Sequence, residues 1–175
     1  ARPSQCPPAG AWFVWVIKAG RGFGNSRAGA EWVRGKIERG EARRVARVMA
    51  GGRRFNFSLV IVIGDKKGRV GVGLGKGADT ALAIDKATRD AKKHIITVLR
   101  TKSGSIPHQV KTKYSSSTVE IIPSKGRGLV AGSAVRTVLD LAGVTDVVTK
   151  IHSRSKNKLT MARATVAALR KLRSA

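Results

Sequence analysis

The sequence is poor in acidic residues, cysteine and long apolar runs. It has 10 Asp and Glu in 175 residues, and those after residue 44 are dispersed, so no close carboxylate pair offers acid–base catalysis. Cys6 is the only cysteine, which excludes an intrachain disulfide and a cysteine-based zinc cluster. The three histidines lack metal-ligand spacing. The sequence therefore predicts no enzyme, no metal site and no cofactor.

The longest strongly apolar run, residues 11–17, is far too short to span a membrane. It also lacks a convincing cleavage pattern, so a secretory signal is not indicated. The first 30 residues contain no Asp or Glu, and an organelle transit segment therefore stays open as an alternative.

Positive charge is abundant instead. The 35 Lys and Arg give a formal net charge of +25, and a partner with dense negative charge would relieve this self-repulsion. Nucleic acid fits, because phosphate contacts release condensed counterions. An anionic membrane calls for a basic amphipathic helix or a polybasic run beside an anchor. Because the basic residues are scattered along the chain, we expect nucleic acid and no membrane.

The composition shifts near residue 45. Residues 1–44 contain all three tryptophans and nine basic residues, and we interpret them as a basic N-terminal extension that is helical around residues 31–44. The extension could dock on RNA or on a neighbouring protein, or be a lineage-specific addition. A break at Gly104 and Pro107 then separates two small predicted domains, residues 45–106 and 107–175.

The periodicity predicts an α+β fold. In the first domain, alternation over residues 55–63 indicates a strand with one strongly apolar face, and a turn at 65–68 leads into a second strand. Residues 79–99 then have helical spacing. In the second domain we expect a helix from about residue 134 to 142, with Gly143 as its C-terminal stop. The other predicted elements there are strands at 109–114, 118–122 and 144–151 and a helix at 160–173.

Glycines beside basic residues form the strongest motif, Arg47 with Gly51-Gly52-Arg53-Arg54. Paired glycines allow a sharp bend and a close approach to a ribose-phosphate chain. The arginines can bind phosphate or guanine through two hydrogen bonds. A basic bend that faces solvent explains the same residues, and the chemistry alone leaves both interpretations open.

A glycine at every second position from residue 71 to 77 could suggest a phosphate-cradling loop. Such a loop should lie between a strand and a helix, whereas these glycines line one face of a strand. We therefore expect close packing of a helix, or an approach of RNA, at this face.

A second glycine-and-base loop, Ser124-Lys125-Gly126-Arg127-Gly128, leads towards a helix that contains Arg136. Backbone amides and a helix N-terminus favour anions, so we expect contact with phosphate or a partner here; a mobile basic loop is the alternative. The spacing of Ser153 and Lys156 formally fits a catalytic motif but lacks the companion motifs.

Blocks that cover about three-quarters of the chain together resemble bacterial-type small-subunit ribosomal protein five. No block is decisive alone, but their order is highly specific. They include Gly51-Gly52-Arg53-Arg54-Phe55-Asn56-Phe57-Ser58, Gly73-Leu74-Gly75-Lys76, Ile106-Pro107-His108, Leu141-Ala142-Gly143-Val144-Thr145-Asp146-Val147 and Arg163-Ala164-Thr165.

The resemblance implies a first domain like a double-stranded-RNA-binding domain, with a sheet and one helix, and a second that is an α/β sandwich. It implies a structural constituent of the small ribosomal subunit, cytoplasmic or organellar, that supports assembly and translational accuracy. The implied partners are ribosomal RNA, ribosomal proteins four and eight, protein three nearby, and messenger RNA at the entry channel.

The resemblance and the motifs together give the expected site residues. Residues 45–54 correspond to the family's loop beside the spectinomycin site, although Ala50 stands where lysine is frequent. Residues 123–128 form a loop one residue shorter than the family's loop. Basic residues stand in it where the family has an acidic and a hydroxyl residue. We expect contact with a ribosomal protein at Gly126, Arg127, Gly128 and Arg136. We expect contact with ribosomal RNA at Arg47, Gly51, Gly52, Arg53, Arg54, Lys66, Lys67, Lys76, Lys125, Arg127 and Arg163.

Two other hypotheses account for less of the chain. A free binder of double-stranded RNA would explain the first domain through shape and phosphate contacts, but leaves the second without a role. An enzyme that acts on nucleic acid would need a metal or general-base cluster that the sequence does not offer.

Overall fold

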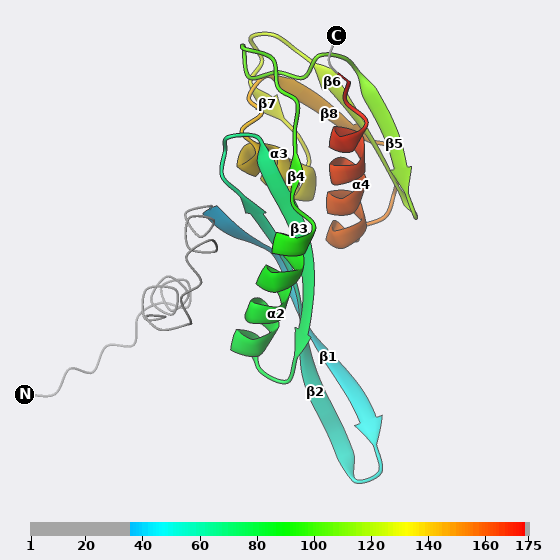
Figure 1. Cartoon of the computed structure of the whole chain (residues 1–175). Coiled ribbons are helices and arrows are strands. Elements are labelled where there is room, and N and C mark those ends of the chain that lie inside the picture. The colour runs from blue at the N-terminus through cyan, green and yellow to red at the C-terminus, as the bar shows by residue number, and fades with distance from the viewer. Residues whose placement is uncertain (1–35, 174–175) are drawn as a thin grey trace, which may run out of the picture. The chain divides into compact units, whose positions relative to one another are not determined.

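The computed structural model describes residues 36–173, and residues 35–175 cluster into one compact unit. The described residues form two four-stranded sheets and three helices (Figure 1). The predicted α+β class is therefore confirmed. The elements are β1 (Lys36–Met49), β2 (Gly52–Gly64), β3 (Arg69–Gly77), α2 (Thr80–Lys93), β4 (Ile96–Thr97), β5 (Val110–Tyr114), β6 (Ser117–Pro123), β7 (Leu129–Val130), α3 (Ser133–Ala142), β8 (Val147–Ile151) and α4 (Lys158–Arg170).

The first sheet has the order β1-β2-β3-β4, and all its neighbours are antiparallel. The predicted hairpin is the β2–β3 pair. Its turn is held by Asp65, whose Oδ1 accepts hydrogen bonds from the backbone N–H groups of Lys67 (2.8 Å) and Arg69 (3.1 Å). Gly68 has φ +102°, a conformation that glycine adopts without strain.

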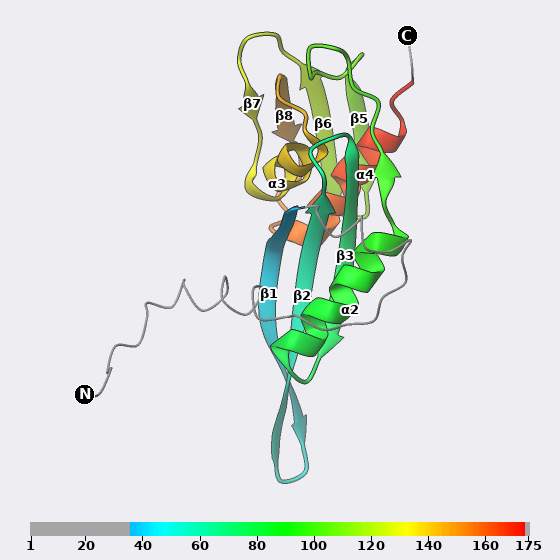
Figure 2. The ribbon, with the colours of Figure 1, turned by 60° about the vertical axis from the view of Figure 1, so that its left-hand side comes forward.

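Helix α2 packs against β3 through the alternating glycines (Figure 2). A Cβ atom at Gly73 would collide with the backbone nitrogen of Ala91 and would lie 2.8 Å from its Cβ. The backbone N–H of Leu74 also donates to Asp90 Oδ2 at 2.9 Å. The expectation of close helix packing at this strand face is confirmed, because a side chain there would push α2 off the sheet.

The prediction of a helix over residues 79–99 is wrong at its C-terminal end. Helix α2 ends at Lys93, and residues 96 and 97 form β4 beside β3. Ile95 and Leu99 continue the helical spacing, but the buried residues are Ile96 and Val98, which alternate as a strand does.

The prediction of a helix around residues 31–44 is also wrong for the described part, residues 36–44, and the rest of it lies outside the described residues. Residues 36–49 form β1, and the register with β2 shifts between Arg39 and Glu41. Gly40 stands at this irregularity. Glycine costs a helix about 1 kcal/mol relative to alanine, whereas it is common at strand bulges.

The second sheet has the order β5-β6-β8-β7, in which only β7 and β8 are parallel. The strands and helices predicted in this region are confirmed, with shifted ends. Helix α3 ends at Ala142, and the next residue, Gly143, has φ +75° and the left-handed conformation expected of a helix stop. Asn157 caps α4, since its side-chain oxygen accepts a hydrogen bond from the backbone N–H of Leu159 at 3.1 Å.

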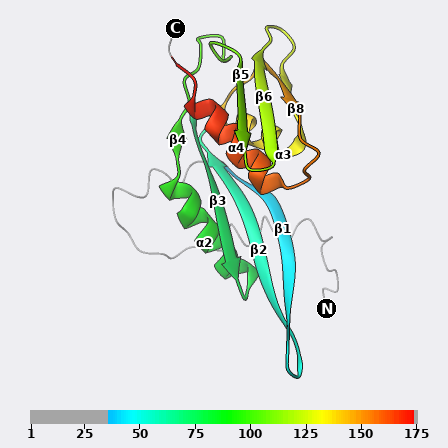
Figure 3. The same cartoon turned by 90° about the vertical axis from the view of Figure 1, so that its right-hand side faces the viewer.

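Helices α3 and α4 contact both sheets and lie between them (Figure 3). One hydrophobic cluster joins Val60 and Val62 of β2 to Leu139 and Leu141 of α3. Leu59 and Ile61 point to the opposite face, where Ile61 packs with residues of α2. The prediction that β2 has one strongly apolar face therefore needs correction, because from Leu59 onward both faces are buried. The division at residue 107 remains a prediction.

The β2–β3 turn is hydrogen-bonded to the C-terminal end of α3. The backbone N–H of Lys66 donates to the carbonyl of Leu141 at 2.9 Å. Arg100 Nη1 donates to the carbonyls of Lys66 (3.2 Å) and Gly143 (2.9 Å). The bonds to Leu141 and Gly143 satisfy carbonyl groups that the end of α3 leaves free, and together the bonds fix the first sheet against α3.

Candidate nucleic-acid interface

The β1–β2 hairpin extends beyond the rest of its sheet. Strand β3 pairs with β2 only from Phe57 to Gly64, so the hairpin tip has no third strand (Figure 1). We call residues 42–56 the ribbon; all of them are exposed. Gly51, at the turn, has φ +89°, which accounts for a glycine there. An isolated two-stranded hairpin is only marginally stable in water, so the ribbon gains from a bound partner.

The ribbon contains five arginines and no acidic residue. Arg47 stands directly opposite Arg54 in the register, and Arg53 stands opposite Val48, so arginines occupy both faces. Like charges directly opposite each other destabilise a strand pair, and an anion between them relieves this repulsion. Within residues 41–173 no carboxylate forms a salt bridge with any of these three arginines.

The other two arginines of the ribbon have partners. Arg43 lies 3.0 Å from the carboxylate of Glu41, and the Arg44 guanidinium lies 4.6 Å from the centre of the Phe55 ring. Apolar side chains lie between the charges, with Val48 75% and Phe55 44% exposed. A two-stranded ribbon with arginines and apolar groups can bind phosphates while it packs against ribose and bases.

The β6–β7 loop carries the second predicted motif. Lys125, Gly126 and Arg127 are exposed, and Gly126 and Gly128 have φ of +77° and +67°. The loop is fixed at both ends, because the N–H of Ser124 donates to Asp146 O (3.3 Å) and the N–H of Val147 donates to Gly128 O (3.2 Å). Positive φ angles let neighbouring backbone N–H groups converge, which suits an anion or a partner's carboxylate.

Arg136 lies in the first turn of α3 and is exposed. Its backbone N–H donates to Gly132 O at 2.7 Å. Gly132, the residue before α3, has no side chain to cap the helix. The guanidinium and the helix dipole thus add positive potential at the same helix end.

The remaining predicted residues lie apart from the ribbon tip. Lys66 is in the β2–β3 turn, where its Nζ lies 3.6 Å from Asp140 of α3, and Lys67 is exposed in the same turn. Lys76 is exposed on β3, opposite Ser58. Arg163 is half-buried on α4. The structure therefore brings Arg47, Gly51, Gly52, Arg53 and Arg54 together and distributes the others over separate surfaces.

Several acidic residues hold the fold together. Asp79 accepts a hydrogen bond from the Thr80 backbone N–H at 2.6 Å, and Asp90 accepts one from Leu74. The hydrogen bond from His152 (2.6 Å), followed by that from Gln109, holds the pKa of Glu120 below its ordinary value. Because these carboxylates serve internal contacts, the excess positive charge stays available to a partner.

In the described part of the chain, no group of three or more His, Cys, Asp or Glu is placed to hold a metal ion. None of the helices seen there is long and apolar enough to cross a membrane.

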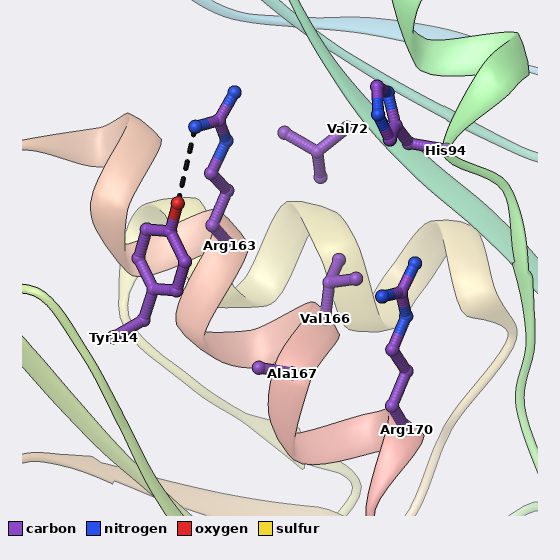
Figure 4. A pocket seen from close by; sticks show the side chains of 7 residues that line it. All are labelled: Val72, His94, Tyr114, Arg163, Val166, Ala167 and Arg170. Carbon is purple, nitrogen blue, oxygen red and sulfur yellow. Dashed lines mark hydrogen bonds between the residues drawn. The ribbon is translucent and has the colours of Figure 1, made fainter.

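Sequence reasoning missed a cavity of about 310 Å³ between α4, the end of β5 and the end of α2 (Figure 4). Arg163 and Arg170 line it from α4, and Tyr114 lines it from β5. The seven-residue spacing of the two arginines places them on one helix face and was a usable signal. The proximity of these arginines to His94 depends on tertiary packing, and no pattern in the sequence predicts it.

Two sheets with packed helices and an exposed basic ribbon suit a structural protein that binds nucleic acid, and comparison with known proteins agrees with this class. Residues 41–99 match the family described as Ribosomal protein S5, N-terminal domain, and residues 112–175 match Ribosomal protein S5, C-terminal domain. The chain belongs to the ribosomal protein S5 family of the small ribosomal subunit. This family consists of structural ribosomal proteins and not of enzymes.

Three relatives, each named small ribosomal subunit protein uS5, illustrate the similarity. The one from Persephonella marina is 50% identical over 135 residues, 77% of this chain and 69% of the relative. The one from Thermus thermophilus is 43% identical over 133 residues, 75% and 81% of the two chains. The one from Mycoplasmopsis agalactiae is 46% identical over 132 residues, 75% of this chain but 57% of the relative. The matched part thus spans little more than half of that last protein. The resemblance seen in the sequence is confirmed.

Proposed function

We propose that the chain is a structural constituent of the small ribosomal subunit and binds its ribosomal RNA through the ribbon. One observation carries the proposal: five arginines lie on both faces of the ribbon, which is exposed and contains no acidic residue. RNA phosphates supply the missing negative charge, and the apolar side chains between the arginines pack on ribose and bases. The ribosome is then the place where the chain acts.

The body of the protein gives this contact a fixed direction. Strand β2 runs without interruption from the ribbon tip into the core shared with α3. Phosphate contacts position a protein on RNA, so a ribbon anchored in this core holds RNA helices and protein neighbours in register. Lys67, Lys76 and Lys125 are exposed on other surfaces and add further phosphate contacts.

Replacing Arg53 and Arg54 with alanine tests the RNA contact. We expect weaker binding to a small-subunit ribosomal RNA fragment and a salt dependence reduced by about two phosphate contacts. The measurement is the binding constant as a function of salt concentration. The variant with Arg154→Ala and Lys156→Ala removes the same charge from an exposed loop and serves as the control. An unchanged salt slope for the ribbon variant refutes the assignment.

The β6–β7 loop and Arg136 form the proposed contact with ribosomal protein four. The support is an exposed Arg127 on a loop fixed at both ends, together with family membership. By the same family membership we propose that ribosomal protein eight is a second neighbour, that protein three lies nearby, and that the chain borders the messenger RNA entry channel. Translational accuracy and subunit assembly then depend on this face.

Charge reversal at the loop, Arg127→Glu with Arg136→Glu, is expected to impair assembly of the small subunit and to alter decoding accuracy. The reason is repulsion by the partner surface that now faces two acids. Sedimentation profiles and a misreading reporter measure the two effects. Lys102→Glu with Lys113→Glu, also exposed, is the matched control. If assembly and accuracy both stay normal in the loop variant, the loop does not meet this partner.

Co-sedimentation with ribosomal particles across rising salt separates this function from that of a free RNA binder. We expect the chain to stay on the small subunit after a high-salt wash. Release at modest salt, with equal binding to unrelated duplex RNA, would mean that charge alone drives binding and that no ribosomal site exists.

A further inference from the structure

The cavity beside α4 gathers positive charge that the ribbon does not use. Figure 4 shows Arg163 and Arg170 extending from the same side of α4 towards Val72 and His94. Arg163 Nη1 donates to the hydroxyl of Tyr114 at 3.3 Å. No carboxylate lines the cavity, and among residues 41–173 none forms a salt bridge with either arginine. The two guanidinium groups are therefore available to a ligand with an anionic group.

The floor between the arginines is apolar. Val72, of which only 6% is exposed, Val166 and Ala167 form it. The volume of about 310 Å³ lies at the lower end of the range of ligand pockets, about 300–1,000 Å³. A water molecule occupies about 30 Å³ in the liquid, and the cavity is many times larger. A single phosphate group would therefore fill only part of the cavity and leave the apolar floor in contact with water. The cavity thus suits a ligand with an anionic end and an apolar part.

Two rings border this floor. Tyr114 closes one side, where its hydroxyl is held by Arg163. His94, the residue after α2, lies across from α4; its Nδ1 donates to the backbone carbonyl of Asp90 at 2.9 Å and lies 3.3 Å from the Asp90 carboxylate, which is not part of the lining. Aromatic side chains next to arginines are the usual surroundings of an unstacked base whose phosphate is bound nearby.

We propose that this cavity binds one unstacked nucleotide of single-stranded or bulged RNA. The phosphate lies between Arg163 and Arg170, and the base packs on Val72 and Val166 beside Tyr114. The inference rests on the proposed RNA-binding function but concerns a site separate from the ribbon. A free nucleoside monophosphate offers the same chemistry, so the test distinguishes the two sources.

Tyr114 is the only tyrosine of the chain and therefore a site-specific probe. The full chain with ring-labelled tyrosine is titrated with 5′-AMP, with adenosine and with a short unstructured oligoribonucleotide, and the Tyr114 NMR signal is followed. We expect it to shift with 5′-AMP and with the oligoribonucleotide. Adenosine, which has no phosphate, is expected to bind at least about tenfold more weakly, because the charged hydrogen bonds to the arginines are lost.

The double variant R163Q/R170Q is expected to weaken binding of 5′-AMP and of the oligoribonucleotide about tenfold or more. The control R154Q/R173Q removes the same charge from exposed positions that do not line the cavity, and it should bind as the natural chain does. Amide spectra check that both variants are folded. Equal weakening in both variants would show a general charge effect and overturn the inference.

Two further results would overturn the inference without touching the proposed function. One is an unshifted Tyr114 signal with every probe, while ribosomal RNA still binds through Arg53 and Arg54. The other is a shift with 5′-AMP that the oligoribonucleotide neither reproduces nor displaces, which would identify a free nucleotide as the ligand. The proposed function fails instead if replacing Arg53 and Arg54 leaves the salt slope unchanged, whatever the cavity binds.

Discussion

Replacing Gly73 with alanine is expected to lower the free energy of unfolding by about 3 kcal/mol or more. The new methyl group would collide with the backbone carbonyl of Ala87 and the backbone nitrogen of Ala91, and it would lie 2.8 Å from the Ala91 Cβ. These neighbours are backbone atoms and a Cβ of one helix, so no side chain can rotate away. The whole of α2 would have to move off β3. Denaturant titration of the purified variant gives the measurement.

Two variants calibrate this result. A Cβ at Gly77 would have its nearest contacts at 2.9 Å, so Gly77→Ala should cost clearly less than Gly73→Ala. Ala46→Val adds two carbon atoms to an exposed position of the ribbon and is expected to be near neutral. If Gly73→Ala unfolds at the same denaturant concentration as the natural chain, close packing of α2 does not explain the glycines.

Replacing Leu139 with alanine is expected to cost about 2–5 kcal/mol and to destabilise both sheets in one transition. Leu139 is fully buried in α3, in the cluster that contains Val62 of the first sheet and Ile121 of the second. A cavity there weakens contacts on both sides. Hydrogen exchange at the backbone amides of Val62 and Ile121, followed against denaturant, should show both sheets losing protection together.

A side-chain truncation at an exposed position of the ribbon is the control for the Leu139 variant. Val48 is 75% exposed, so Val48→Ala should change the free energy of unfolding by less than about 0.5 kcal/mol. Two separate transitions in the Leu139 variant, with only the second sheet weakened, would show that the two sheets do not share one cooperative core.

The sequence predicts local structure correctly wherever a few neighbouring residues determine it. The Asp65 turn, the stop at Gly143 and the alternating glycines each follow from a few adjacent positions. The end of α2 did not, because Ile95 and Leu99 match a helix while strand pairing with β3 buries Ile96 instead. In such a short apolar segment, tertiary pairing overrides local periodicity.

Packing between elements that are distant in the sequence could not be predicted. Val60 and Val62 alternate with Leu59 and Ile61, and only the presence of α3 shows that both sets are buried. The candidate site divides in the same way. The glycine and arginine motif at residues 51–54 is contiguous in the sequence and could be predicted from it. The cavity, in contrast, brings together Tyr114, Arg163 and His94 from three separate elements.

The continuity of β2 has a mechanical consequence. At one end, residues 59–64 are held by β1, by β3 and by the hydrophobic cluster shared with α3. At the other end β2 is supported by β1 alone. We therefore expect a load at the ribbon tip to bend the part of β2 that lacks β3 as a neighbour, while residues 59–64 keep their place. Movements of a ligand held by Arg53 and Arg54 would then be absorbed as elastic bending before they reach the core.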